Sequence, residues 1–260
     1  MQFDVVVLTD RRYVSPTKKT PYIENVLLED RLVVEALQNE GLTVGRKAWD
    51  DPDFNWSTTR FALFRTTWDY FDRFAEFSKW LEHASQQTQF INSKELIHWN
   101  IDKHYLQDLS KAGVTIPKTL FIEKGSSITL AEAVAKTQLE YGFASDTFIL
   151  KPCVSGAARH TYKIGKDEIG KHESIFKELI VEEALMLQEF QHHIVSEGEI
   201  SMMLFNGTFT HAVLKIAKAG DFRVQDDFGG TVHEYQPTEE QIAFAQTVVH
   251  AAPQLSLIHI

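Results

Sequence analysis

Strand-like and helix-like segments alternate along the first part of this chain, and this alternation restricts the fold more than any other feature. Apolar, β-branched runs at residues 4–9, 42–46 and 61–65 predict strands. Apolar residues recur at helical spacing over residues 25–40 and 74–84. Strands that alternate with helices favour a parallel sheet, so the N-terminal part up to residue 92 is predicted to form an α/β domain.

After residue 92 the pattern becomes typical of antiparallel sheets. Asn206-Gly207 separates two alternating apolar runs, 199–205 and 208–215, and predicts a β-hairpin. The other predicted elements are strands at 117–122, 148–151, 161–164 and 185–190, and helices at 99–112, 130–141, 175–183 and 239–250. The predicted fold class is therefore α/β followed by α+β with mixed or antiparallel sheets. The second domain, 93–260, is predicted to divide into parts 93–190 and 191–260.

The composition argues against several classes of protein. The 260 residues carry a formal net charge of −10, which disfavours a bulk nucleic-acid binder because such proteins normally present a basic face. No run approaches the ~18 apolar residues of a membrane span, and the N-terminus lacks the basic region of a signal peptide. The single cysteine, Cys153, rules out an intrachain disulfide framework and favours a reducing, cytoplasmic location.

One predicted strand, residues 148–150, leads through Lys151 to a loop of small residues. Pro152 ends the strand pairing, and the small-residue loop, Ser155-Gly156-Ala157-Ala158, follows. Side chains this small let backbone N–H groups approach an anion, and a neighbouring lysine supplies the charge that a polyphosphate requires. Taken alone, the segment fits equally well with a β-turn that carries a surface lysine.

Further polar residues follow at the ends of predicted elements. In chain order they are Lys103, Lys151, the segment Gln188-Glu189-Phe190, Glu199, Lys215 and Arg223. Over about residues 92–230 this order resembles the ATP-grasp superfamily, whose members include D-alanine–D-alanine ligase and glutathione synthetase. The segments 65–70 (Arg-Thr-Thr-Trp-Asp-Tyr) and 220–225 (Gly-Asp-Phe-Arg-Val-Gln) are similar to one branch, which includes the cyclo-ligase of cycloserine biosynthesis.

The resemblance implies a pre-ATP-grasp domain followed by an ATP-grasp domain that holds ATP between its two parts. Lys103 and Lys151 are then expected to bind the ATP phosphates, with the small-residue loop closing over the β- and γ-phosphates. Lys215 and Arg223 are implied to be catalytic, because they would face the transferring phosphoryl group and stabilise its charge.

The resemblance also implies contacts to the rest of the nucleotide and to the substrate. Gln188, Glu189 and Phe190 are expected to form the adenine hinge, and Glu199 to accept hydrogen bonds from the ribose hydroxyls.

In the N-terminal domain, Arg65 is expected to pair with a substrate carboxylate, with Trp68, Asp69 and Tyr70 lining the pocket. Each of these residues, taken singly, also fits a structural role.

ATP-grasp ligases bind Mg²⁺ through acidic and Glu-x-Asn residues on late strands, after the counterpart of the last predicted helix. No Asp, Glu or Asn follows Glu240, so the resemblance implies that the Mg²⁺ ligands lie beyond the end of this chain. Residues 255–260 are interpreted as artefactual sequence after a truncation, the alternative being a natural apolar strand. The acidic residues left as substitute ligands are Asp226, Asp227 and Glu234.

The expected function is an ATP-dependent ligase that forms a C–N bond on a small amino-acid-like substrate. A substrate carboxylate attacks the γ-phosphate to give an acyl phosphate, and a nitrogen nucleophile then displaces phosphate. The alternatives are a small-molecule kinase, an inactive nucleotide-binding module and a relative that shares only the fold. Family members often form dimers, so a homodimer is an open option, whereas no nucleic-acid or membrane partner is expected.

Overall fold

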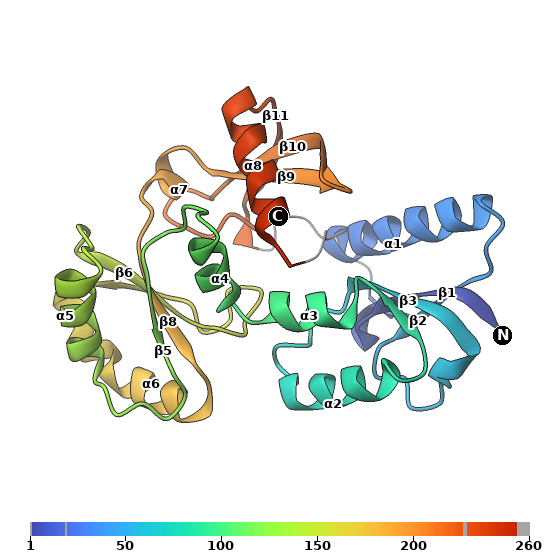
Figure 1. Cartoon of the computed structure of the whole chain (residues 1–260), viewed down its shortest axis with the longest axis horizontal. Coiled ribbons are helices and arrows are strands. Elements are labelled where there is room, and N and C mark those ends of the chain that lie inside the picture. Colours follow the sequence, from blue (N-terminus) through green and yellow to red (C-terminus); the bar gives the residue numbers. More distant parts are fainter. Residues whose placement is uncertain (1, 19, 226–227, 254–260) are drawn as a thin grey trace. The chain divides into compact units, whose positions relative to one another are not determined.

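The computed structural model describes residues 2–18, 20–225 and 228–253 (Figure 1). The chain divides into two compact units, Met1–His98 and Trp99–Ile260. Residues 255–260, and with them the interpretation of the terminal segment, lie outside the described residues, as do Asp226 and Asp227. Within the described part of the chain, no helix combines the length and the apolar character that crossing a bilayer requires.

The first unit is built on a four-stranded, fully parallel sheet of order β2-β1-β3-β4. Its strands are β1 (Phe3–Thr9), β2 (Val44–Ala48), β3 (Thr59–Thr66) and β4 (Gln89–Ile91), and its helices are α1 (Pro21–Asn39) and α2 (Phe74–Ala84). The predicted parallel α/β architecture is confirmed. The sequence did not predict β4, because three residues are too few to show an alternating pattern.

A buried polar network joins the carboxyl ends of the strands in the first unit. Arg46 on β2 forms an ion pair with Asp30 of α1, with 2.6 Å between Nη2 and Oδ2. The Thr66 hydroxyl on β3 lies within hydrogen-bond distance of the hydroxyl of Thr9 on β1 (2.6 Å) and of the Asp30 carboxylate (3.1 Å). These contacts hold α1 against the strand ends, where ligands gather in parallel α/β sheets.

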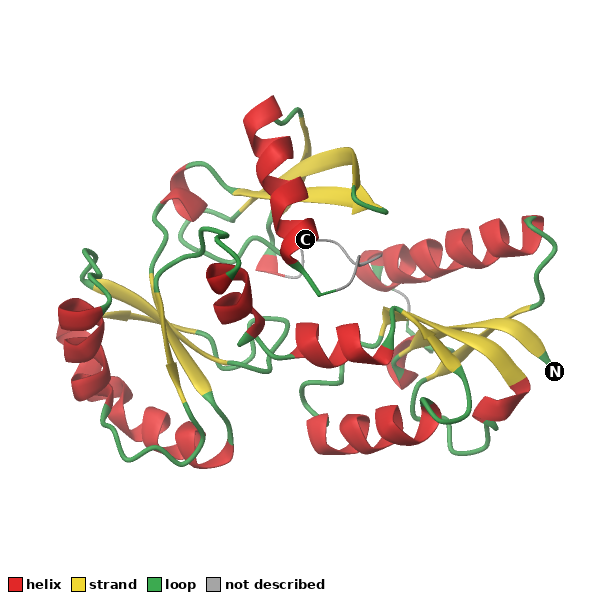
Figure 2. Cartoon of the chain, viewed as in Figure 1, coloured by secondary structure: helices red, strands yellow, loops and turns green. Residues whose placement is uncertain are grey.

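The second unit begins with a four-stranded antiparallel sheet of order β5-β8-β6-β7 (Figure 2). Its strands are β5 (Thr119–Ile122), β6 (Thr147–Pro152), β7 (Tyr162–Gly165) and β8 (Leu185–Glu189), and its helices are α5 (Leu130–Glu140) and α6 (Ile169–Glu182). Leu120, Leu150 and Leu187 point to one face and pack with Phe176 of α6 in the core. Because side chains alternate along strands, the polar residues between them occupy the opposite face.

A smaller antiparallel sheet of order β11-β10-β9 follows in the second unit. Its elements are β9 (Glu199–Phe205), β10 (Thr208–Ile216), β11 (Thr231–Tyr235) and α8 (Glu239–Ala251), preceded by the short α7 (His193–Ser196). The predicted hairpin is confirmed, and Asn206 and Gly207 have φ angles of 50° and 77°, as a primed turn requires. The sequence did not predict β11, which is mostly exposed and lacks an apolar alternation.

The single helix predicted at residues 99–112 is wrong, because two helices occupy this region: α3 (Lys94–Ile101) and α4 (Tyr105–Lys111). Between them, Asp102 Oδ1 accepts a hydrogen bond from the backbone N–H of His104 (3.0 Å). The backbone N–H of Lys103 donates to the carbonyl of Cys153 (3.0 Å), a distant partner that local spacing does not reveal. Lys103 therefore lies on the connection between two helices, two residues before α4.

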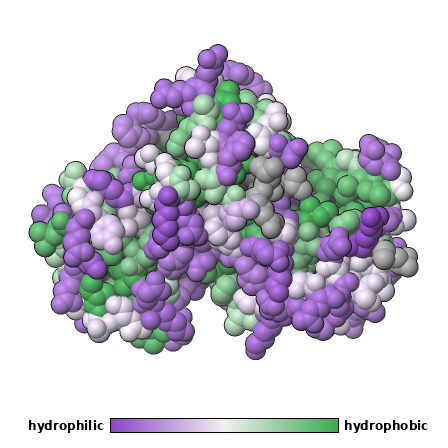
Figure 3. All heavy atoms as spheres, in the orientation of Figure 1, coloured by the Kyte–Doolittle hydropathy of each residue, from purple (hydrophilic) through white to green (hydrophobic). Residues whose placement is uncertain are grey.

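Short 3₁₀ turns occur at Arg11–Tyr13, Trp56–Thr58 and Lys166–Glu168. On the first unit, Figure 3 shows apolar surface over α1, and this helix exposes Leu28 and Leu32 at 40% and 55%. The buried residues of α1 are Val26 and Asp30, and the two leucines add apolar surface to an exposed face that is otherwise mostly polar.

Two substitutions on α6 test the packing of the sheet that carries Lys151. Phe176→Ala is expected to lower the free energy of unfolding by about 3–5 kcal/mol, because the ring is 0% exposed in the core. Val181→Ala, on the same helix but 61% exposed, is expected to stay within about 0.5 kcal/mol of the parent protein. Urea denaturation followed by circular dichroism measures both values. Equal effects for the two variants would contradict this packing.

Candidate nucleotide site

Lys151 lies on the face of the β5-β8-β6 sheet opposite the leucine core. Its Nζ donates to Oε1 of Gln188 (3.1 Å), and the Gln188 amide donates to the Thr119 hydroxyl (2.9 Å). Strand register explains why these three side chains are neighbours. Thr119 and Ile149 both pair with Gln188, and Lys151 is two residues further along β6, on the same face as Ile149. Three neighbouring strands thus place a lysine and its orienting amide on one face.

Lys103 approaches the small-residue loop from the connection between α3 and α4. Its Nζ donates to the carbonyl oxygens of Ser155 (2.6 Å) and Cys153 (3.4 Å). No carboxylate of the described residues lies within ion-pair distance of the ammonium groups of Lys103 or Lys151. The structure therefore brings together the two lysines and the loop that the sequence predicted to bind phosphate.

Burial depresses the pKa of both lysines. Desolvation, assisted by the positive charge of Lys151, lowers the pKa of Lys103 to about 8. Desolvation also lowers the pKa of Lys151, although the negative charge of Glu199 acts in the opposite direction. A polyanion bound beside these groups would restore favourable interactions to the two ammonium ions.

The small-residue loop has the backbone conformation of an anion-binding turn. Ala157 and Ala158 adopt φ angles of 47° and 56°, a left-handed region that non-glycine residues seldom occupy. Within the described chain, the backbone N–H groups of Gly156, Ala157 and Ala158 donate to no protein acceptor. Consecutive unpaired N–H groups in a turn form a concavity suited to phosphate oxygens.

Arg159 anchors this loop to the rest of the sheet. The Arg159 Nη1 and Nη2 atoms each donate to a different carboxylate oxygen of Glu183 at 2.9 Å. The Ser155 hydroxyl donates to the backbone carbonyl of Arg159 (2.8 Å). A two-pronged, partly buried pair of this kind fixes orientation as well as position. Local sequence patterns do not reveal this role of Arg159, because its partner lies 24 residues further along the chain.

The residues predicted as the adenine hinge lie at the end of β8, but their contacts are with the protein. Gln188 orients Lys151, and Glu189 Oε1 accepts hydrogen bonds from the backbone N–H groups of Ala144 (2.5 Å) and Ser145 (2.9 Å). The Phe190 N–H donates to the carbonyl of Thr147 (3.1 Å). These bonds tie the strand end to the loop before β6, and the adenine role stays a prediction.

The predicted ribose residue and the two predicted catalytic residues each form an ion pair in the second sheet or in the segment between its strands β10 and β11. Glu199 and Lys215 are direct cross-strand partners, with 3.4 Å between Oε1 and Nζ. Arg223 holds Asp221 through Nη2 at 2.7 Å, and its guanidinium stacks 3.8 Å from the centre of the Phe228 ring. The Arg223 guanidinium lowers the pKa of the Asp221 carboxyl. The catalytic roles of Lys215 and Arg223 are untested by this geometry.

The residues predicted to bind substrate lie in the first unit around the end of β3. Arg65 pairs with Glu29 (Nη2–Oε2, 3.2 Å), while Trp68 is 37% exposed. Asp69 accepts a hydrogen bond from the indole N–H of Trp49 (2.7 Å) and forms an ion pair with Arg73. Its contacts are therefore structural ones within the first unit. Tyr70 packs against the rings of Phe71 and Phe77. Arg65 and Trp68 are thus the members of this set most available to a ligand.

Potential metal ligands converge at one place in the described part of the chain. Among the described residues, the side chains of Asp102, His104 and Cys153 form the one group with three or more clustered metal-ligating residues. Its nitrogen and sulfur donors do not suit Mg²⁺, which prefers oxygen ligands. This cluster therefore does not fit magnesium.

Comparison with known proteins adds two matches that together span most of the chain. Residues 5–92 match the family described as D-cycloserine synthetase DcsG, N-terminal domain. Residues 118–258 match the prokaryotic glutathione synthetase, ATP-grasp domain. The chain is also 26% identical over 235 residues to the cycloserine biosynthesis protein DcsG of Streptomyces lavendulae, covering 88% of this chain and 75% of that protein.

Solved structures show the same fold. The crystal structure of D-cycloserine synthetase DcsG aligns with a TM-score of 0.81 at 23% identity, covering 95% of this chain and 80% of that one. The ATP-grasp ligase PsnB, complexed with a phosphomimetic variant of its minimal precursor, Mg and ADP, aligns with a TM-score of 0.57 at 16% identity. This alignment covers 97% of this chain and 83% of PsnB. The predicted succession of a parallel sheet and antiparallel sheets is therefore confirmed.

Nucleotide affinity is expected to fall as the pH rises through the pKa of Lys103, which is about 8. Phosphate oxygens favour the protonated amine, so binding that requires this proton weakens by about tenfold for each pH unit above the pKa. Lys103→Arg keeps its charge over this range and is expected to flatten the profile. Calorimetric titration with ATP between about pH 7 and pH 9.5 measures the effect. A profile equally steep in Lys103→Arg would assign the titration to another group.

Proposed function

Because this chain belongs to the ATP-grasp superfamily, in the branch of D-cycloserine synthetase DcsG, we propose that it is an ATP-dependent ligase that forms C–N bonds. Its substrate is proposed to be a small amino-acid-like molecule. The proposed reaction joins a carboxyl or equivalent carbonyl group of this substrate to a nitrogen nucleophile, with cleavage of ATP to ADP and phosphate.

The observation that carries the proposal is the pair of half-buried lysines beside unpaired loop amides. Lys103 and Lys151 have no carboxylate partner among the described residues, and three consecutive N–H groups, Gly156 to Ala158, are open to an acceptor. Withdrawing two ammonium groups partly from water without a counter-ion is unfavourable, and burial accordingly lowers the pKa of both. A triphosphate chain offsets that cost, because it supplies both the charge and the acceptors that these groups lack.

We place the transferring phosphoryl group toward the second sheet. The Lys215 ammonium and the Arg223 guanidinium are the proposed stabilisers of charge that develops on this group. Both are held by carboxylates, Glu199 and Asp221, so a bound substrate would meet preoriented cations. Glu199 is proposed to accept from the ribose hydroxyls through its remaining lone pairs. Catalysis on this proposal comes from positioning and electrostatics, with no covalent enzyme intermediate.

Cys153 is not proposed as a nucleophile. Its thiol is 1% exposed, and burial together with the neighbouring Asp102 raises its pKa to about 12. His104 Nε2 lies 4.0 Å from the sulfur. The high pKa keeps the thiol protonated at neutral pH in spite of this imidazole.

On the substrate side, we propose that Arg65 binds a carboxylate of the amino-acid-like substrate. Its guanidinium is already paired with Glu29 on one side, and Trp68 exposes an aromatic surface in the same segment. A homodimer also stays a prediction.

Lys151→Ala is expected to weaken ATP binding by about 10- to 100-fold, because a charged hydrogen bond to phosphate is lost. Lys171→Ala, on the exposed side of α6, serves as the matched control and is expected to bind ATP as the parent protein does. Calorimetric titration with ATP in the presence of Mg²⁺ gives both affinities. Unchanged affinity in Lys151→Ala would overturn the nucleotide site itself.

Ligation is tested by incubating the chain with ATP, Mg²⁺ and small amino acids, singly and in pairs. A ligase releases inorganic phosphate and yields a product with a new C–N bond, detectable by mass spectrometry. A kinase would instead leave the phosphoryl group on the product, and an inactive module would bind ATP without turnover. Either of the last two results would overturn the ligase proposal while leaving the nucleotide site intact.

A further inference from the structure

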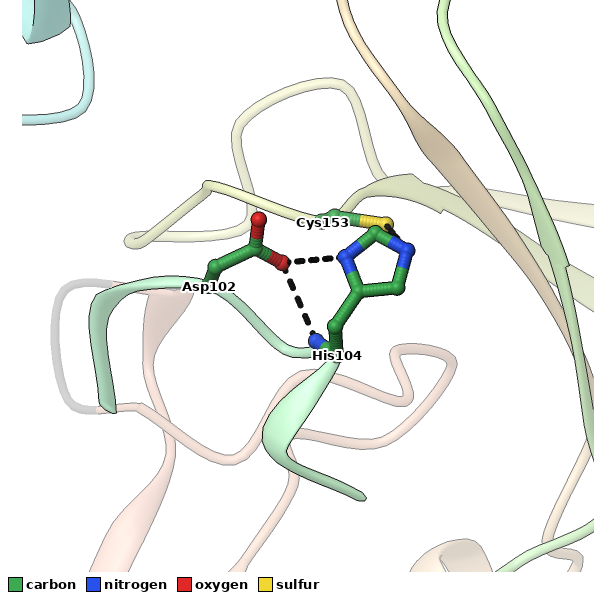
Figure 4. Close-up of side chains that lie close together, drawn as sticks. All are labelled: Asp102, His104 and Cys153. Atoms are coloured by element: carbon green, nitrogen blue, oxygen red, sulfur yellow. Dashed lines mark hydrogen bonds and ion pairs between the residues drawn. The ribbon is translucent and has the colours of Figure 1, made fainter. Parts of the chain in front are cut away.

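Asp102, His104 and Cys153 converge at the edge of the first antiparallel sheet of the second unit (Figure 4). Their ligand atoms all lie within 4.8 Å of one another. Figure 4 shows the imidazole between the carboxylate on one side and the sulfur on the other. The nucleotide site uses none of these three side chains.

The two ring nitrogens of His104 have different neighbours. Nδ1 lies 2.6 Å from Oδ1 of Asp102, whereas Nε2 lies 3.3 Å from Oε1 of Glu123 and 4.0 Å from Sγ of Cys153. A carboxylate on Nδ1 selects the tautomer with its proton there and leaves the Nε2 lone pair free to bind a metal. The ring also packs against that of Phe121 in a tilted arrangement, with 4.7 Å between centroids and 30° between the ring planes.

Strand topology explains why Glu123 and Cys153 approach the same imidazole. Glu123 directly follows β5 and Cys153 directly follows β6, and both strands run antiparallel to β8, which lies between them. Their last residues, Ile122 and Pro152, both pair with Leu185 at the start of β8. Glu123 and Cys153 therefore follow the sheet at the same end of its strands, on either side of β8.

We propose that Cys153 Sγ, His104 Nε2 and Glu123 Oε1 form a zinc-binding site, with Asp102 as the residue that orients the imidazole. Tetrahedral Zn²⁺ with ordinary bond lengths separates N and O ligands by about 3.4 Å and S and N ligands by about 3.6 Å. The observed N–O separation, 3.3 Å, is close to the first value, whereas the S–N separation, 4.0 Å, is longer than the second. The clustered ligand atoms of the structure are those of Asp102, His104 and Cys153, so the exposed Glu123 carboxylate has to move toward the sulfur to complete the site.

The donor set and its access both favour zinc over a harder cation. One sulfur, one imidazole nitrogen and one carboxylate oxygen suit a borderline-soft divalent ion. Cys153 is buried, whereas the side chains of His104 and Glu123 are 27% and 76% exposed. Binding replaces the S–H bond by a Zn–S bond and releases the thiol proton to solvent. The fourth coordination position remains for water.

A metal at this site would connect the two segments that position Lys103. The carbonyl of Cys153 already accepts from both the backbone N–H (3.0 Å) and the ammonium (3.4 Å) of Lys103. Coordination of one metal ion by Cys153 and His104 would add a second connection between the segment after β6 and the segment before α4. Zinc is therefore expected to raise the melting temperature of the protein, because it binds only the folded arrangement.

The test titrates the full chain with Zn²⁺ alone, and in parallel with Co²⁺ as a spectroscopic substitute. The chain contains eleven histidines but one cysteine, so a thiolate-to-cobalt charge-transfer band in the near ultraviolet reports Cys153 and no other residue. The expected result is one strong site with this band and a raised melting temperature. Cys153→Ser is expected to lose the band and the strong site, and Asp102→Asn to weaken affinity by about 10- to 100-fold.

His98→Gln is the matched control, because this half-exposed histidine pairs with Glu82 outside the site and should leave zinc affinity unchanged. The circular dichroism and melting temperature of each metal-free variant show whether it is folded. Absence of the cobalt–thiolate band in the folded parent protein would overturn the proposal. So would equal zinc affinity in folded Cys153→Ser and the parent, because binding would then belong to surface histidines.

Discussion

The second unit depends on accommodating two lysine ammonium groups, Lys103 and Lys151, within a region of low solvent access. Each is held by neutral groups, the backbone carbonyls of Ser155 and Cys153 in one case and the Gln188 amide in the other. Neutral acceptors orient an ammonium group without cancelling its charge, so both cations keep their attraction for an anion. The cost is a lower pKa for each, which couples the site to pH.

The two faces of the first antiparallel sheet have different roles, since one packs in the core and the other carries Lys151. Leu120, Leu150 and Leu187 form the core on one face, and they hold the strands in register. That register in turn sets Lys151 beside Gln188 on the other face. The Arg159–Glu183 pair then fixes the loop whose amides are left unpaired. Stability and binding thus reside on opposite faces of the same strands, because strand side chains alternate.

Much of this arrangement was predictable from local signals. The parallel sheet of the first unit followed from the alternation of strands and helices, and the β9–β10 hairpin followed from Asn206-Gly207. The two short or exposed strands, β4 and β11, escaped prediction because neither carries an apolar alternation long enough to recognise. The break between α3 and α4 also escaped, since its cause is the distant carbonyl of Cys153.

The sequence by itself determined the kinds of element, the loop of small residues and the lysine that precedes it, because propensity, periodicity and residue size act locally. Only the tertiary structure decided what these residues meet. It brought Lys103 to Ser155 across 52 positions and His104 to Cys153 across 49. It also paired Arg159 with Glu183. The physical reason is that burial, electrostatic environment and ligand geometry depend on residues that approach one another only when the sheets form.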